Sequence, residues 1–410
     1  MHLRDNLPHT LPTGKAIFWA NGCRTFPKRA QYSPQVVCAA GRFPVEIDDN
    51  TVICDNFRAG LSSSRNSRIQ FMKRHFLLLL SLISFAAIAT ASGSEPYHFL
   101  KEIPIGGEGG WDYLSLDPAG HRLYLSHATK VVAVDTEKDA VAGEVADTPG
   151  VHGFAIAPEL GRGFASNGRE AKASIVDLKT LKTISKVETG ENPDAILYDT
   201  AHKEVYTFNG RGHSATVFDA QSGKVLATIP LPGKPEFAVE DPKADRIYNN
   251  IEDKHQLVVI DAKEHKVVNT WPIEPGEAAS GLAIDRSHHR LFLGCDNKLM
   301  LMIDSVNGKV MDKVAIGEGV DATAFDPETQ LAFASCNGTA TIAHEDSPDK
   351  MTIVQTLKTA TGARTMALDP TTHKIYLPTA QYEAQEQKSD GSRKRPRIIA
   401  GTFKILVYGM

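Results

Sequence analysis

The chain has 410 residues, of which 42% are hydrophobic and 23% are charged, and its formal net charge is −4. This composition is ordinary for a soluble globular protein and excludes a fibrous or wholly disordered chain. The length alone allows two or three domains, but the internal repeats favour one large closed domain behind a leader.

The first predicted element in chain order is a signal peptide that begins at Met72. A positive stretch at residues 73–75 precedes an apolar run of 14 residues at 76–89, and the small residues of Ala89-Thr90-Ala91 follow. This order is typical of a secretory signal. The run is shorter than the roughly 20 apolar residues of a transmembrane helix. We predict cleavage after Ala91 and a periplasmic or secreted protein, with a buried core helix or an uncleaved anchor as alternatives.

Residues 1–71 precede this signal, although a signal peptide acts at the N-terminus of a chain. They are rich in Arg, Ser, Pro and Asn and show no sustained helical or strand period. We expect translation to start at Met72, which makes residues 1–71 a non-native upstream extension. A disordered extension is the alternative.

Without residues 1–91 the chain is acidic. Residues 92–410 hold 34 Lys and Arg against 44 Asp and Glu, a net charge of about −10. Nucleic-acid binding without sequence preference relies on a broad positive surface, which such a chain lacks. We therefore expect no nucleic-acid partner.

Residues 92–410 contain seven repeats of about 42 residues. A turn dipeptide, with Asp first in six of the seven repeats, precedes an aromatic residue by six or seven positions. Asp suits a turn because it bonds its own backbone, and the Pro that often follows presets φ. The aromatic residues recur every 40 to 44 positions, at Tyr124, Phe164, Tyr206, Tyr248, Phe292, Phe333 and Tyr376.

Each repeat is predicted to form four short strands. In the third repeat these strands are residues 195–198, 204–208, 215–219 and 225–229, separated by turn residues such as Asn209-Gly210. Four strands every 42 residues are typical of a propeller blade, and no segment has an amphipathic helical period. The sequence therefore predicts an all-β fold, a seven-bladed β-propeller over residues 92–410.

The two ends of the repeat region complement each other. The seventh repeat has only three strands, at residues 365–368, 374–377 and 402–408, while a spare strand at residues 99–105 precedes the first repeat. We predict that this N-terminal strand pairs with residues 402–408 and closes the seventh blade. Closure removes the exposed sheet edges of an open stack.

The strand sequences resemble the YVTN β-propeller repeat family, and within it the YncE-type exported bacterial propellers. Tyr206-Thr207-Phe208-Asn209 and Phe164-Ala165-Ser166-Asn167 come nearest to the Tyr-Val-Thr-Asn strand of that family, and the resemblance covers residues 97–410. It implies a propeller with a binding role, because the family has no common chemistry.

One polar residue per repeat stands five positions before the turn, where an inner strand begins. In a propeller these positions form a ring around the channel mouth, which can bind a ligand or a hard cation, supply an acid/base pair, or merely cap loops. We predict a ligand site there, with Arg211 and His213 on its rim; these two are alternatively solvated loop residues. The ring consists of Asp112, His152, Asp194, Glu236, Ser280, Asp321 and Arg364.

Three further features are less specific. The longest loop, residues 380–397, ends in a basic cluster and is predicted to be a lid, a docking arm or a solubilising tip. Cys295 and Cys336 occupy matching places in neighbouring repeats, and the sequence leaves open whether they are bonded. His344-Glu345-Asp346 is expected to form a turn at the end of a third strand, away from the mouth.

No enzyme motif is present: the sequence has no His-Glu-x-x-His, Gly-x-Ser-x-Gly, P-loop or haem-attachment pattern, and it indicates no particular cofactor. Two functions stay open. We favour a monomeric binding or scaffold protein whose partner is a small molecule or protein at the channel mouth. The alternative is a metal-dependent propeller hydrolase or lyase of lactonase-like type that uses the polar ring.

Overall fold

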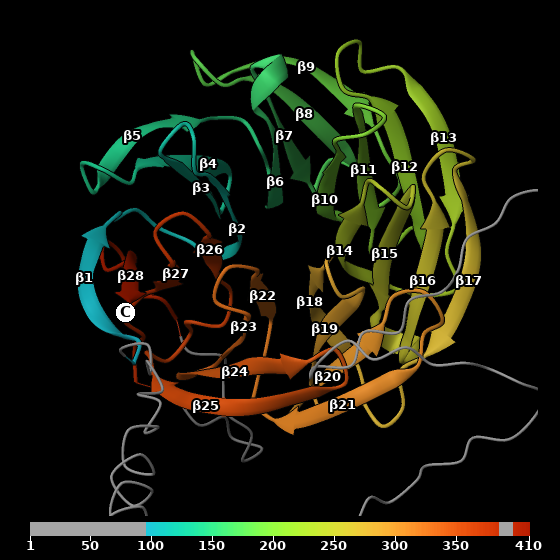
Figure 1. Cartoon of the computed structure of the whole chain (residues 1–410). Coiled ribbons are helices and arrows are strands. Elements are labelled where there is room, and N and C mark those ends of the chain that lie inside the picture. Colours follow the sequence, from blue (N-terminus) through green and yellow to red (C-terminus); the bar gives the residue numbers. More distant parts are fainter. Residues whose placement is uncertain (1–95, 385–396) are drawn as a thin grey trace, which may run out of the picture. The chain divides into compact units, whose positions relative to one another are not determined.

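The computed structural model describes residues 96–384 and 397–410. The predicted extension, the predicted signal peptide and most of the predicted long loop, at 385–396, lie outside the described residues. The described residues form seven antiparallel sheets of four strands each, arranged in a ring (Figure 1). The prediction of a seven-bladed all-β propeller is confirmed.

The first three blades follow the predicted four-strand repeat. Blade 1 is formed by β2 (Trp111–Asp117), β3 (Arg122–His127), β4 (Lys130–Asp135) and β5 (Ala140–Val145). Blade 2 is formed by β6 (Val151–Ala157), β7 (Arg162–Asn167), β8 (Lys172–Asp177) and β9 (Lys182–Glu188). Blade 3 is formed by β10 (Pro193–Asp199), β11 (Glu204–Asn209), β12 (Ser214–Asp219) and β13 (Val225–Pro230).

The next three blades repeat this order. Blade 4 is formed by β14 (Pro235–Asp241), β15 (Arg246–Ile251), β16 (Gln256–Asp261) and β17 (Lys266–Pro272). Blade 5 is formed by β18 (Ala279–Asp285), β19 (Arg290–Cys295), β20 (Leu299–Asp304) and β21 (Val310–Ala315). Blade 6 is formed by β22 (Ala322–Asp326), β23 (Leu331–Cys336), β24 (Thr339–Ser347) and β25 (Lys350–Lys358).

Blade 7 joins the two ends of the described chain. It is formed by β26 (Ala367–Asp369), β27 (Lys374–Thr379), β28 (Lys404–Gly409) and the N-terminal strand β1 (His98–Pro104). Strand β1 pairs antiparallel with β28, from His98 opposite Gly409 to Pro104 opposite Lys404. The predicted closure by the N-terminal strand is confirmed, and Figure 1 shows β1 on the outer edge of that blade.

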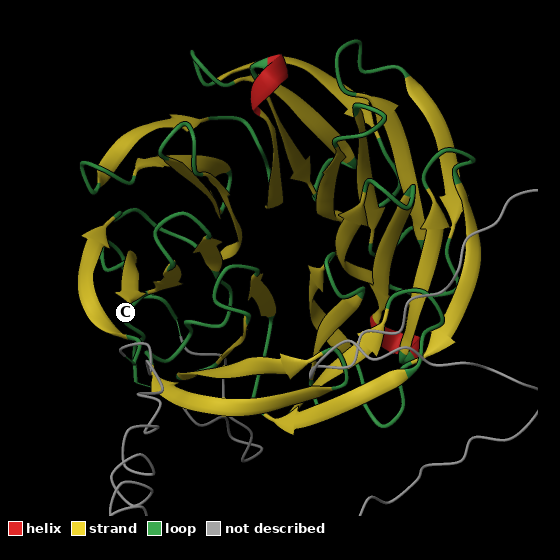
Figure 2. Ribbon diagram, viewed as in Figure 1, coloured by secondary structure: helices red, strands yellow, loops and turns green. Residues whose placement is uncertain are grey.

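The predicted turns form because aspartate side chains bond the backbone that follows them. Asp199 Oδ1 accepts the N–H of Ala201 at 2.9 Å, and Asp285 Oδ1 accepts the N–H of Ser287 at 2.8 Å. Blade 2 has Ala157-Pro158 instead, and a short 3-10 helix, η1 (Pro158–Leu160), makes the turn. The other described helix is the equally short η2 (Glu252–Lys254), so the ring is almost wholly strand (Figure 2).

The core lies between the blades. All seven repeat aromatics are buried, with at most 2% of their surface exposed. Burial of a side chain of this size stabilises the fold by about 1.5–3 kcal/mol. Two tyrosines also bond the next blade: Tyr206 donates its hydroxyl to the carbonyl of Ala262 at 3.1 Å, and Tyr248 to that of Ser305 at 2.9 Å. Each repeat thus depends on its neighbour for its core.

Two local features are decided by the structure. The sequence left open whether Cys295 and Cys336 are bonded; both are free and buried, so no disulfide joins them. The expected turn at His344-Glu345-Asp346 is wrong, because these residues extend β24, which pairs with β25 as far as Ser347 opposite Lys350. The hairpin of blade 6 is longer than its counterparts and carries these side chains in a strand. Across the described part of the chain, no helix is both long and apolar enough to cross a membrane.

Candidate functional site

The predicted polar ring lies at one end of the innermost strands. In the first five blades its residue is the second of β2, β6, β10, β14 and β18, and in the last two it directly precedes or lies shortly before β22 and β26. These first strands contact one another around the ring, including β2 with β26. The fold therefore gathers one polar side chain per blade at a common end, and the ring residues divide into three groups that are bonded within themselves.

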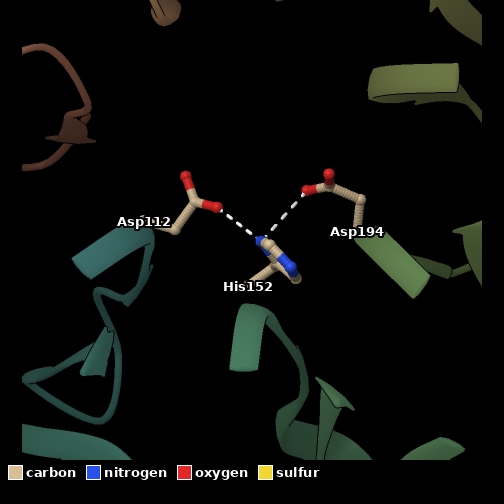
Figure 3. Close-up of side chains that lie close together, drawn as sticks. All are labelled: Asp112, His152 and Asp194. Atoms are coloured by element: carbon tan, nitrogen blue, oxygen red, sulfur yellow. Dashed lines mark hydrogen bonds and ion pairs between the residues drawn. The ribbon is translucent and has the colours of Figure 1, made fainter. Parts of the chain in front are cut away.

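The first group is Asp112, His152 and Asp194, from blades 1, 2 and 3 (Figure 3). His152 Nδ1 lies 2.7 Å from Asp112 Oδ2 and 3.6 Å from Asp194 Oδ1. One imidazole N–H thus faces two carboxylates. The donor atoms of these three residues all lie within 4.8 Å of one another, a spacing that a metal ion could bridge.

The two carboxylates determine the charge of the histidine. Burial alone would lower the pKa of His152, but the hydrogen bond to Asp112 and the charges of Asp194 and Asp112 raise it to about 9. Burial, together with the charge of Asp112, raises the pKa of Asp194 to about 6 against the opposing effect of His152. Near neutral pH the group therefore holds an imidazolium between two carboxylates.

The second group surrounds Glu236 of β14. Lys234 Nζ lies 2.5 Å from Glu236 Oε1 and 2.5 Å from Glu252 Oε2, and the hydroxyl of Tyr113 donates to Glu236 Oε2 at 3.2 Å. Burial and the charge of Asp194 raise the pKa of Glu236 to about 8 despite Lys234. Burial and four surrounding carboxylates hold the pKa of Tyr113 well above its usual value, so its hydroxyl stays a donor.

The third group joins blades 6 and 7. Arg364 Nη1 lies 2.9 Å from Asp321 Oδ2, and burial raises the pKa of Asp321 to about 7 although Arg364 opposes this. The remaining ring residue, Ser280, donates its hydroxyl to the carbonyl of Val320 at 2.9 Å. Blade 5 thus contributes no charge to the ring.

The loop-capping alternative does not describe this arrangement. Within the described residues, no loop N–H donates a hydrogen bond to the side chains of Asp112, Asp194, Glu236 or Asp321, which pair with other side chains. A cap does occur beside the ring, at Asp253 of η2, whose Oδ1 accepts the N–H of Lys234 at 2.7 Å. The four ring carboxylates are held in place by side-chain pairing.

A cavity of about 970 Å³ opens beside the second and third groups. This volume is at the upper end of the range of small-molecule sites. Trp111 borders it, with its ring stacked on Phe403 at a centroid distance of 4.8 Å. The polar and aromatic residues of its lining are Trp111, Lys234, Glu236, Glu252, Ser280, Asp296, Asp321, Asn337, Thr361, Arg364, Tyr382 and Glu383.

The predicted site residues are thus distributed unequally. Glu236, Asp321 and Arg364 line the cavity, whereas Asp112, His152 and Asp194 form the separate group drawn in Figure 3. The two predicted rim residues, Arg211 and His213, are exposed in the turn between β11 and β12 and do not belong to the cavity lining.

Two residues that contribute to the site were not predicted from the sequence. Tyr113 directly follows the ring residue of blade 1, and strand alternation predicts that its side chain points away from the ring. A register shift between β2 and β3, from Trp111 to Leu114, interrupts this alternation. Lys234 lies two positions before Glu236, and side chains two positions apart in an extended chain point to the same face. This spacing could have predicted that Lys234 lies beside Glu236.

Comparison with known proteins supports a YncE-type propeller. No protein-family model matches the chain. It is 27% identical over 95 residues to the protein named YncE of Salmonella typhimurium (strain LT2), and equally to that of Salmonella typhi; both are described as uncharacterized. The match covers 23% of this chain and about a quarter (27%) of the length of these curated relatives.

Solved structures share the fold. Hydrazine synthase of Kuenenia stuttgartiensis aligns with a TM-score of 0.56 and 17% identity over 66% of this chain and 92% of that one. The structure of U3-55K aligns with a TM-score of 0.63 and 8% identity over 75% of this chain and 98% of that one. At such identities the likeness concerns the architecture alone.

Proposed function

We propose that this YncE-type propeller is an exported binding protein that takes a small organic cation in the cavity at the mouth of its ring. The observation that carries the proposal is the excess of acid in the cavity lining. Two cationic side chains, Lys234 and Arg364, face five carboxylates, which are Glu236, Glu252, Asp296, Asp321 and Glu383.

The two cationic side chains of the lining are already neutralised. Lys234 is shared by Glu236 and Glu252, and Arg364 is paired with Asp321. Crowded carboxylates repel one another, and a bound cation relieves this repulsion. The surplus of acidic side chains therefore attracts a cationic ligand. Burial, together with the neighbouring carboxylates, raises the pKa of Glu236 to about 8 and that of Asp321 to about 7.

The aromatic border of the cavity favours an organic cation over a bare metal ion. Trp111 and Tyr382 lie on one side of the cavity with ring centroids 6.4 Å apart. Cations of ammonium type are attracted to the faces of Trp and Tyr, by roughly 0.5–2 kcal/mol per contact. A lining that combines carboxylates with aromatic rings therefore suits an amine or a quaternary ammonium group.

The proposal is tested by calorimetric titration of the purified protein with three probes of similar size. Tetramethylammonium and 1,4-diaminobutane are expected to bind, with an affinity that falls as salt concentration rises, whereas the dianion succinate is not. Tighter binding of succinate than of either cation, or no binding of either cation, would contradict the proposal.

Export is a second part of the proposal and is supported by the sequence of residues 72–91. A cell fractionation with mass analysis of the purified protein tests it directly. We expect the periplasmic or secreted fraction to contain a chain that begins at Ser92. Recovery of a chain that still carries residues 72–91 from the cytosol would contradict this part.

A second candidate function is metal-dependent hydrolysis, and one observation favours it. The donor atoms of Asp112, His152 and Asp194 lie within 4.8 Å of one another, and a metal ion there would have mixed nitrogen and oxygen ligands of the kind that suits Mn²⁺ or Zn²⁺. Hydrolysis of a simple aliphatic lactone with added Mn²⁺ tests it. Turnover that is lost in His152→Ala would support the enzyme, and no turnover above the metal alone would remove it.

A further inference from the structure

A second polar cluster lies at the end of the inner strands that is opposite to the ring. Asp285 is the last residue of β18, whereas the ring residue Ser280 is near its start. His288 follows three residues later in the turn to β19, and Glu345 projects from β24 of the next blade. The donor atoms of these three residues lie within 4.8 Å of one another. The cluster therefore bridges blades 5 and 6.

Glu345 is the unusual member of the cluster. Its side chain is 0% exposed, and within the described residues neither of its carboxylate oxygens accepts a hydrogen bond. Its Oε1 lies 3.3 Å from His288 Nδ1, which is itself 2.6 Å from Asp285 Oδ2. A buried carboxylate without hydrogen bonds is costly unless a proton or a cation joins it.

Arg290 is the nearest fixed cation, but it does not pair with Glu345. Its Nη1 lies 3.0 Å from Asp304 Oδ2, and its Nε donates to the carbonyl of Pro348. The remaining group that faces Glu345 is His288, whose side chain is 34% exposed. The ion-pair partner of Glu345 is therefore a histidine that it shares with Asp285, and no Lys or Arg of the described residues pairs with it.

The other repeats show that Glu345 is not needed for the fold. In blade 6 the first residue of the second strand, Leu331, pairs with His344 of the third strand. Glu345 is the residue directly after His344. By the same pairing, five other blades carry a neutral residue at this place: Thr136, Leu178, Ala220, Ala262 and Ser305. Blade 3 has a similar turn, with His202 Nδ1 2.8 Å from Asp199 Oδ2, but the neighbouring blade offers Ala262 there.

We propose that Asp285, His288 and Glu345 bind a divalent transition-metal ion, with Zn²⁺ as the best match, and that this ion ties blade 5 to blade 6. One imidazole and two carboxylates form a ligand set that suits zinc, and its fourth position would open toward solvent beside His288. Two ligand atoms at about 2.0–2.1 Å from a tetrahedral ion are about 3.3 Å apart. The Nδ1 to Oε1 distance of 3.3 Å already has this value. The shorter distance to Asp285 is that of a hydrogen bond, which the ion would replace.

The experiment uses the full chain, stripped with a chelator and dialysed, to which ZnCl₂ is added. Zinc bound per chain is measured by elemental analysis, affinity by competition with a chromophoric chelator, and thermal stability by calorimetry. We expect a bound zinc ion and a rise in Tm, because a ligand that binds only the folded state stabilises it. Glu345→Ala, which installs the residue found at this place in blades 3 and 4, is expected to fold and to bind one zinc ion fewer. Any residual affinity should be weaker by about 100-fold or more, since loss of an outer-shell partner alone costs 10–100-fold.

Two matched variants separate this site from others. His202→Ala alters the comparable turn of blade 3, and His152→Ala alters the ring, so both should keep the ion that Glu345→Ala loses. The proposal is overturned if Glu345→Ala binds zinc like the wild type, if the wild type binds none, or if His152→Ala loses the ion instead. Unaltered zinc binding by His288→Ala would overturn it as well.

Discussion

The hydroxyl of Tyr113 donates a hydrogen bond to Oε2 of Glu236, 3.2 Å away, although the two residues are 123 positions apart in the sequence. Tyr113 belongs to β2 of blade 1 and Glu236 to β14 of blade 4. The ring of Tyr113 also packs edge-on against Phe237 at a centroid distance of 5.4 Å. One side chain therefore links two blades that are not neighbours, beside the cavity that the carboxylate lines.

Tyr113→Phe should destabilise the propeller by about 1 kcal/mol, because the substitution removes this hydrogen bond and keeps the aromatic packing. For a chain of this size we expect Tm to fall by about 2–4 °C, measured by scanning calorimetry. Tyr408→Phe is the control, since Tyr408 is also buried but its hydroxyl donates no hydrogen bond to another described residue. Equal effects of the two variants would contradict a specific role for the Tyr113 bond.

Stability should fall as pH rises from 6.5 to 9. The folded-state pKa values of Asp321, Glu236 and His152 are raised to about 7, 8 and 9. A group whose pKa is raised on folding stabilises the protein fully below its unfolded pKa, which is about 4 for the carboxyls and about 6.5 for histidine. That contribution is lost as pH rises through the folded value.

The measurement is Tm against pH for the wild type and for Glu236→Gln. The variant cannot ionise at this position, so its Tm should fall less across the same range, and the difference between the two proteins should grow up to about pH 8 and then level off. Superimposable curves for the two proteins would show that Glu236 titrates without cost to the fold.

Removal of charge from the cavity should weaken cation binding. The double variant Glu236→Gln and Asp321→Asn keeps the shape of two lining side chains and replaces both ionisable carboxyl groups with neutral amides. We expect its affinity for 1,4-diaminobutane to fall about tenfold or more, which corresponds to about 1.4 kcal/mol. Glu137→Gln removes a carboxylate that is 67% exposed on a turn of blade 1 and serves as the control. Equal affinity in the double variant and the control would place the cation elsewhere.

Ring closure should depend on Tyr97 as well as on the strand that follows it. Tyr97 is 3% exposed, donates its hydroxyl to the carbonyl of His373 at 2.6 Å, and exchanges two hydrogen bonds with Gln355 of blade 6. Tyr97→Ala should cost about 3–5 kcal/mol, as truncation of a buried aromatic does. Removal of residues 97–105 should abolish cooperative unfolding, measured by calorimetry, because it exposes the edge of β28.

The expectation that residues 97–105 are needed for cooperative unfolding would be contradicted if β1 contributed little to stability. In that case the chain lacking residues 97–105 would retain a cooperative transition with a Tm near that of the wild type. The full-length chain with Phe99→Ala is a useful comparison, since Phe99 lies in the same strand but is 52% exposed. Its Tm should change little.

The two described cysteines should be inert in the native protein. Burial raises the pKa of the Cys295 thiol to about 12 and that of Cys336 to about 11, so neither holds an appreciable thiolate near neutral pH. In a chain that begins at Ser92, a thiol reagent such as iodoacetamide should label neither until a denaturant is added, and then both. Labelling of either in the native state, detected by mass spectrometry, would contradict the burial.

The repeat, the number of blades, the closing strand and the position of the polar ring could all be predicted from the sequence. Each of these depends on short-range signals that recur seven times: an aspartate turn, a buried aromatic such as Tyr206, and one polar residue at the start of each inner strand. A local signal that recurs at a fixed period specifies the fold, because every blade must bury its face against the next.

The pairing of the ring residues could not be predicted from the sequence and is known from the three-dimensional structure. Asp112 shares His152 with Asp194, and Glu236 bonds a tyrosine from three blades away. At the other end of the strands, Glu345 lies beside His288 of the preceding blade. The repeat places such residues at one end of the blades, but it does not determine which of them bond to one another. These contacts depend on which side chain reaches across a gap of a few ångströms between blades, and that distance is set by packing rather than by spacing in the sequence.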